Sequence, residues 1–226
     1  MKFPVLTITR FIGFLITIFL WRSIQIAQFA QIVSYLLIFG SILLVFPVVY
    51  FGRKAIDANP TIIRLDWTTT IIHFTLMVLL GMSIIEAIKF FRDEHGIFIP
   101  VPVWLAVALL LFTGVLSLLT VVNLALSGMG APFAIIQSRR IANRWMYRYT
   151  RNPMVLATLA TLLSVGLYLQ SLYFVLWVFL LVTPAWIYFL KVYEERELEI
   201  RFGTSYLDYK KRTSFLWPKK PKNRIL

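Results

Sequence analysis

Three polar clusters in the C-terminal part of the chain contain the residue types that bind a small charged molecule. Gly128 and Gly130 lie in the first, the segment Tyr147–Met154 forms the second, and Glu194–Glu197 lies in the third. A mostly apolar segment of about forty residues separates the second cluster from the third. Ionisable groups beside apolar segments are costly near a bilayer unless they bind something. We therefore expect the three clusters to surround a ligand.

Asn152 and Pro153 have the sequence pattern of a helix start. Asn is a good N-cap, and Pro suits the first helical position. This is also how many ordinary helices begin, so the pattern alone leaves its role open. A helix N-terminus carries partial positive charge that attracts a carboxylate or phosphate, and Arg151 adds a group suited to bidentate binding.

Glu194 and Glu195 follow the last long apolar segment. Adjacent residues of a helix point in different directions, so we expect the two carboxylates to have different roles. Glu197 and Arg201 are four residues apart, and we expect them to form an exposed ion pair. Gly203 is expected to end this helix.

Six apolar segments must position these clusters. The chain has 226 residues, of which 59% are hydrophobic, too much apolar surface for a soluble domain of this size. The segments lack the period-two pattern of a membrane barrel, so we predict an all-α, polytopic bundle of about five or six transmembrane helices. They are 11–21, with a possible start at residue 3, 32–51, 68–88, 101–126, 154–169 and 172–190.

The last two segments are expected to form a tight antiparallel hairpin, because only Gln170 and Ser171 separate them. Pro184 predicts a kink in the second of the two. A helical segment on the cytoplasmic side is expected to follow.

The net charge of +13 comes mainly from Lys and Arg in loops beside apolar segments. This distribution favours topology control and contact with anionic lipid over nucleic-acid binding. The positive-inside rule predicts that both termini and the polar clusters are cytoplasmic. The chain has no cysteine, and therefore no disulfide and no thiolate metal site. We expect no metal.

Three further ionisable residues lie in or near apolar segments. We expect Asp66 to pair with Arg64 at the membrane interface, and Glu86 to lie near the outer interface. His73 is deeper and is an open candidate for facing a cavity, although a single histidine on a helix more often has a local hydrogen-bond partner.

The combination of Tyr-Arg-Tyr-Thr-Arg-Asn-Pro-Met at 147–154 with Glu-Glu-x-x-Leu-x-x-x-Phe-Gly-x-x-Tyr-x-x-Tyr at 194–209 resembles a known group. It is similar to the isoprenylcysteine carboxyl methyltransferases, the phosphatidylethanolamine N-methyltransferases and their bacterial relatives. The resemblance covers about the last two-fifths of the chain. It implies a helical membrane protein whose C-terminal part, here residues 128–226, encloses S-adenosylmethionine, with residues 1–127 forming four preceding helical segments.

The resemblance also implies the site residues. Arg151 and Asn152 become the candidate catalytic residues, and a larger set is expected to surround the cofactor. That set is Gly128, Gly130, Tyr147, Arg151, Asn152, Pro153, Glu194 and Glu195.

The chain differs from the common pattern at Val155 and Ala157, where Tyr and Gly are usual. In addition, no charged residue lies between Trp104 and Gln137. A relative that methylates a carboxylate would be expected to offer a cation there. We therefore expect a lipid or another lipophilic acceptor that is not a carboxylate.

Two other functions remain open at this point. Sterol and steroid reductases share a similar C-terminal pattern, which would imply a reduced nicotinamide cofactor. A non-catalytic membrane protein that keeps the fold would bind neither cofactor. The oligomeric state is not indicated.

Overall fold

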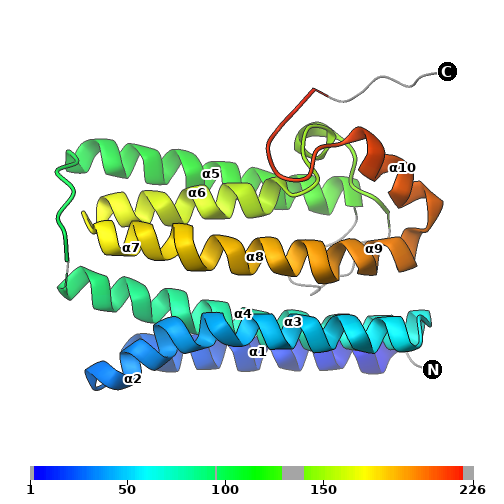
Figure 1. Ribbon diagram of the computed structural model, residues 1–226, viewed down its shortest axis with the longest axis horizontal. Coiled ribbons are helices and arrows are strands. Elements are labelled where there is room, and N and C mark those ends of the chain that lie inside the picture. Colours follow the sequence, from blue (N-terminus) through cyan, green and yellow to red (C-terminus); the bar gives the residue numbers. More distant parts are fainter. Residues whose placement is uncertain (1–2, 95, 129–139, 221–226) are drawn as a thin grey trace.

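The computed structural model describes residues 3–94, 96–128 and 140–220, and confirms the predicted all-α architecture. Its long helices run in alternate directions along one axis (Figure 1). The helices are α1 (Phe3–Ile26), α2 (Gln31–Tyr35), α3 (Ser41–Ala58), α4 (Ile62–Asp93), α5 (Val103–Gly128), α6 (Pro153–Tyr168), α7 (Leu172–Trp177), α8 (Thr183–Phe189), α9 (Glu195–Phe202) and α10 (Thr204–Arg212). Shorter turns are η1 (Leu36–Gly40), η3 (Trp145–Arg148), η4 (Val178–Val182) and η5 (Leu190–Glu194).

Five helical segments are long and apolar enough to cross a membrane. The sixth, α6, has 16 residues, or about 24 Å at 1.5 Å per residue, against about 30 Å of hydrocarbon. These segments confirm the predicted multi-pass membrane protein with five to six transmembrane helices. The five are Val5–Ile26, Gln31–Ala58, Ile62–Asp93, Val103–Gly128 and Leu172–Phe202.

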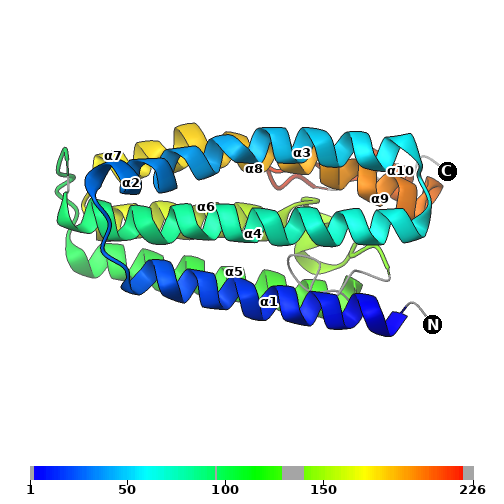
Figure 2. The ribbon, with the colours of Figure 1, turned by 90° about the horizontal axis from the view of Figure 1, so that it is seen from below.

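The helices form two groups that meet along a shared core. α4 packs on α1 and α3, while α5 packs on α6. The long helix from α7 to α9 lies between α6 and the pair α3 and α4 (Figures 1 and 2). Val45 and Val49 of α3, Phe174 of α7 and Val182 of η4 are fully buried in this core. Side-chain packing between helices from both halves of the sequence therefore stabilises one common interior.

The last long helix runs without interruption from Leu172 to Phe202, so the helix expected to follow the last apolar segment is continuous with it. Two turns of π-helix, η4 and η5, lie within it. Pro184 has no N–H to donate, and a π turn directly precedes it, where the Thr183 hydroxyl donates to the Val178 carbonyl over 2.9 Å. Glu194, the last residue of η5, and Glu195, the first residue of α9, therefore lie on the same long helix.

The turn between α6 and α7 confirms the predicted hairpin. Gln170 adopts a left-handed backbone conformation with φ of 54°, and its carbonyl accepts a hydrogen bond from the Ile99 N–H over 2.9 Å. The Leu172 N–H donates to the Ile97 carbonyl, also over 2.9 Å. The α4–α5 connection therefore pairs with this turn and satisfies its backbone groups.

Glu86 is buried at the same end of the bundle. It accepts hydrogen bonds from Ser34 over 2.7 Å and from Lys89 over 2.8 Å. Lys89 also donates to the carbonyls of Ile24 and Ala27, at the end of α1. These contacts fasten α1 and α2 to α4.

Candidate functional site

A cavity of about 340 Å³ lies at the other end of the bundle, where α4, α5, α6 and the α8–α9 part of the last long helix converge. Most of its walls are apolar, and Trp186, Phe189 and Leu198 are among them. Tyr147, Arg151, Asn152 and Glu194, four of the predicted site residues, also line it. The volume is in the range of about 300–1,000 Å³ that is typical of small-molecule sites.

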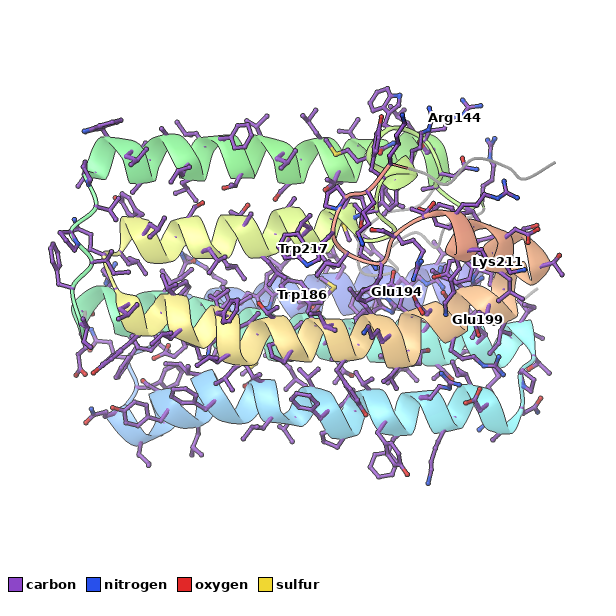
Figure 3. The ribbon with its side chains drawn as sticks, turned by 45° about the horizontal axis from the view of Figure 1, so that its top comes forward. Arg144, Trp186, Glu194, Glu199, Lys211 and Trp217 are labelled. Atoms are coloured by element: carbon purple, nitrogen blue, oxygen red, sulfur yellow. The ribbon has the colours of Figure 1, made fainter. Side chains whose placement is uncertain are left out.

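Glu194 and Glu195 point to different places, as their adjacency predicted. Figure 3 shows Trp186 and Glu194 on the side of the last long helix that faces α6, and both line the cavity. Glu195 instead forms ion pairs with Arg151 over 2.5 Å and with Lys210 over 2.6 Å. Among the described residues no hydrogen-bond or ion-pair partner of the Glu194 carboxylate is found.

Arg151 connects the start of α6 to the C-terminal segment. Its guanidinium donates to the carbonyls of Lys210 over 3.0 Å and Thr213 over 2.6 Å, in addition to its pair with Glu195. The Arg151 Nε atom is buried, and no described residue is its hydrogen-bond partner. Three hydrogen bonds from the Arg151 guanidinium therefore hold the protein together, and its Nε has no acceptor among the described residues.

Asn152 occupies the N-cap position of α6, but its side chain makes no cap hydrogen bond, which corrects the predicted capping role. Its Nδ2 donates instead to the Phe215 carbonyl over 2.9 Å. The Arg151 N–H donates to the Ser214 carbonyl over 2.8 Å, and the Lys219 N–H donates to the Tyr149 carbonyl over 3.0 Å. The C-terminal segment thus forms the outer support of the Arg151–Asn152 turn.

Glu197 and Arg201 form the predicted ion pair, at 2.6 Å, but the prediction that this pair is exposed is wrong. Glu197 is only 6% exposed, and both residues line the cavity. Arg201 also pairs with Asp66 over 2.9 Å, so the expected partnership of Asp66 with Arg64 is wrong as well. Glu197 and Arg201 of α9 therefore line the site as an ion pair, and Asp66 of α4 supports Arg201 from beside the cavity.

Three tyrosines, Tyr147, Tyr206 and Tyr209, also line the cavity. The Tyr209 hydroxyl donates to the Tyr147 carbonyl over 2.6 Å, and Tyr206 is 2% exposed. Burial raises the pKa of all three phenols, and the negative charge of Glu194 adds to the effect at Tyr147. They are therefore neutral hydrogen-bonding groups at physiological pH.

The remaining predicted residues lie beside the cavity or outside the described residues. Gly128 is the last residue of α5, and its carbonyl accepts a hydrogen bond from the Arg140 N–H over 3.2 Å. Pro153 is the buried first residue of α6. Neither is among the residues that line the cavity. Gly130 lies outside the described residues.

The sequence left His73 of α4 as an open candidate for facing a cavity and did not identify the other polar residues that line it. Thr69 and His73 line the cavity, as do Ser117 of α5 and Thr158 of α6. The one usable signal was the presence of an ionisable side chain inside an apolar segment, which applies to His73 alone.

Among the described residues, no group of three or more His, Asp or Glu side chains is arranged to hold a metal.

The fold and the cavity together define a polytopic helical membrane protein with a carboxylate-lined cavity near one end. Residues 101–205 match the model of the phospholipid methyltransferase family. The match confirms the predicted resemblance to membrane methyltransferases over this part of the chain. It includes Arg151, Asn152, Glu194 and Glu195, whereas His73 and the other cavity residues of α4 lie outside it. Comparison with curated proteins gives no match, and neither does comparison with solved structures.

Proposed function

We propose that this protein is an integral membrane methyltransferase that uses S-adenosylmethionine and methylates a lipid or lipophilic acceptor. The observation that carries the proposal is the Glu194 carboxylate, which lines a cavity of suitable volume and has no partner among the described residues. An uncompensated carboxylate away from bulk water is costly, so a cationic ligand that pairs with it is strongly favoured.

The residues of the cavity fit this cofactor. S-adenosylmethionine carries an ammonium and a sulfonium for Glu194, and a carboxylate for the unpartnered Nε of Arg151. Apolar side chains such as Phe189 and Leu198 suit the faces of its adenine. When bound, the cofactor supplies an electrophilic methyl group whose positive charge disperses as the group is transferred. An apolar site therefore does not hinder the reaction, and alignment of the acceptor supplies much of the acceleration.

The same groups disfavour a nicotinamide cofactor with several phosphates. Two of the arginines that line the cavity, Arg151 and Arg201, are already paired with carboxylates. Glu194 and Glu197 add negative charge to the walls. Phosphate groups require uncommitted cations or helix N-termini, so this balance of charge supports S-adenosylmethionine.

We infer that the cofactor reaches the cavity from the cytoplasm, while the acceptor enters from the bilayer. α1 begins and α10 ends at the end of the bundle that contains the cavity (Figure 1). The basic residues of the sequence gather in the connections expected at that end, which supports a cytoplasmic location. The charge-free sequence of α5 supports an acceptor other than a carboxylate.

The test is a calorimetric titration of the purified protein, in detergent, with S-adenosylmethionine, its demethylated product and NADPH. The proposal predicts saturable binding of the first two and none of NADPH. Tight binding of NADPH would support a reductase instead. A folded protein that binds none of the three contradicts the proposal and supports a non-catalytic role.

A further inference from the structure

His73 presents one ring nitrogen whose protonation state follows from geometry. Its Nδ1 lies 2.8 Å from the Thr69 carbonyl oxygen, one helical turn earlier on α4. A carbonyl oxygen only accepts, so Nδ1 must carry the proton that makes this hydrogen bond. In the neutral imidazole, Nε2 is then an unprotonated acceptor.

The ring of His73 is held in place by aromatic neighbours from the last long helix. The Phe189 ring lies edge-on to it, with 5.3 Å between the ring centroids, and Tyr193 makes a similar contact at 6.4 Å. The Tyr193 hydroxyl is hydrogen-bonded to the Thr69 hydroxyl over 3.1 Å. This packing leaves the ring little freedom to turn. No described residue is hydrogen-bonded to Nε2.

His73 of α4 and Glu194 of the last long helix line the same cavity. The other ionisable groups on the described walls are poorly suited to remove a proton. Glu197 is committed to Arg201, the arginines are cations, and the Tyr209 hydroxyl donates to a carbonyl. Glu194 is the group that we assign to the charge of the cofactor. His73 remains as a neutral nitrogen base with a free electron pair.

We propose that His73 is the general base of the methyl transfer and that the acceptor is an amine or a hydroxyl that must lose a proton. This inference rests on the proposed methyltransferase function. As the bond between the acceptor atom and the methyl carbon forms, the carbon–sulfur bond breaks, and its electron pair stays on sulfur. The N–H or O–H proton moves to Nε2, and the imidazolium later releases it to solvent.

The class of acceptor follows from the step that a general base assists, which is the removal of a proton from the acceptor. A carboxylate acceptor is already ionised at neutral pH and needs no base. An alcohol, or an amine that becomes an alkylammonium, has a proton to lose, and a positioned base typically contributes about 10²–10⁴-fold to such a step. A base on α4 favours an acceptor that has a proton to lose. The absence of charged residues in α5 favours an acceptor other than a carboxylate.

The first test is nitrogen NMR of histidine, because the sequence contains only His73 and His95. Spectra of protein labelled with ¹⁵N at histidine, compared with the variants His73→Gln and His95→Gln, assign each resonance. The proposal predicts that neutral His73 carries its proton on Nδ1. It also predicts that the Nε2 resonance moves when dodecanol is added to protein saturated with the demethylated cofactor product. A proton on Nε2, or a resonance that dodecanol leaves unmoved, would overturn it.

The second test measures transfer of a labelled methyl group from S-adenosylmethionine to three lipid probes in nanodiscs. The probes are dioleoylphosphatidylethanolamine, dodecanol and oleic acid. We expect transfer to the amine or the alcohol. We expect His73→Gln to lower kcat about 100-fold, with little change in KM or in cofactor affinity, and His95→Gln to behave like the unmodified protein.

Three outcomes would contradict the role of His73 and leave the proposed methyltransferase function unaffected. These are an unchanged kcat in His73→Gln on the amine or alcohol, transfer to oleic acid alone, or an equal loss of cofactor affinity and rate in His73→Gln. If no probe is methylated, the NMR result decides. Failure of the unmodified protein to bind S-adenosylmethionine contradicts the proposed function itself, and the titration shows this separately.

Discussion

Arg201 and Asp66 form an ion pair, with 2.9 Å between Nη2 and Oδ1, that joins the last long helix to α4. Arg201 holds Glu197 at the same time, over 2.6 Å. Asp66 lies outside the region that matches the methyltransferase family, whereas Arg201 lies within it. The N-terminal helices therefore complete the charge balance of the site.

Replacement of Arg201 by Met is predicted to destabilise the protein by about 3–5 kcal/mol, because it leaves two carboxylates partly or fully buried without their cation. The side chains of Arg201, Asp66 and Glu197 are 14%, 24% and 8% exposed, so solvent screens them little. Thermal unfolding in detergent measures the effect. The control is Arg64→Met, an exposed arginine near Asp66, which should leave the unfolding midpoint unchanged. Equal unfolding midpoints for Arg201→Met and Arg64→Met would contradict this role of Arg201.

The sequence allowed the helices to be predicted well, since six apolar segments are a local signal of length and composition. The burial of Glu197 and Arg201 was not predictable in this way. Their spacing is typical of an exposed pair, and the partner that makes the difference, Asp66, lies 135 residues from Arg201. The sequence left the cavity role of His73 open, because a lone histidine gives no sign of what α5 and α6 place beside it. The hydrogen bond from Asn152 to Phe215 likewise depends on the fold of the C-terminal segment.

Asn152→Ala is predicted to cost about 1 kcal/mol of stability through loss of the hydrogen bond to the Phe215 carbonyl. Asn152→Asp should cost more, because a carboxylate would then face that carbonyl oxygen. Denaturant unfolding compares both variants with Asn59→Ala, which changes an exposed asparagine at the end of α3. If Asn152→Asp is as stable as the unmodified protein, the contact does not support the turn.

The three tyrosines of the site predict loss of stability at alkaline pH. Their pKa values are raised above 10.0 by burial, so the folded state binds more protons than the unfolded state above that pH. Their contribution is complete below pH 10 and is lost as the pH rises toward the raised values. Tyr209→Phe should therefore lose less stability than the unmodified protein between pH 10 and pH 11. If thermal scans at these pH values show equal losses of stability for Tyr209→Phe and the unmodified protein, the prediction is wrong.

Gly81 of α4 lies directly against the Trp21 side chain of α1. A Cβ atom at this position would lie 2.1 Å from Nε1 of Trp21, and that nitrogen donates to the Met77 carbonyl over 3.1 Å. Gly81→Ala is therefore expected to cost about 1–3 kcal/mol through overpacking. Gly114→Ala is the matched control, since no atom lies within 4 Å of a Cβ there. Thermal midpoints should fall for Gly81→Ala alone, and a similar fall in both would show that helix packing is not the cause.

The central claim is that the carboxylate of Glu194 binds the charge of the cofactor. The most direct measurement is the dissociation constant of S-adenosylmethionine, by calorimetry, for the unmodified protein, Glu194→Gln and Glu199→Gln. Glu199 lies on the same helix but is paired with Lys210 and Arg196. We predict at least tenfold weaker binding for Glu194→Gln, about 1.4 kcal/mol, and an unchanged constant for Glu199→Gln. Equal affinity in Glu194→Gln and the unmodified protein would contradict the proposed site.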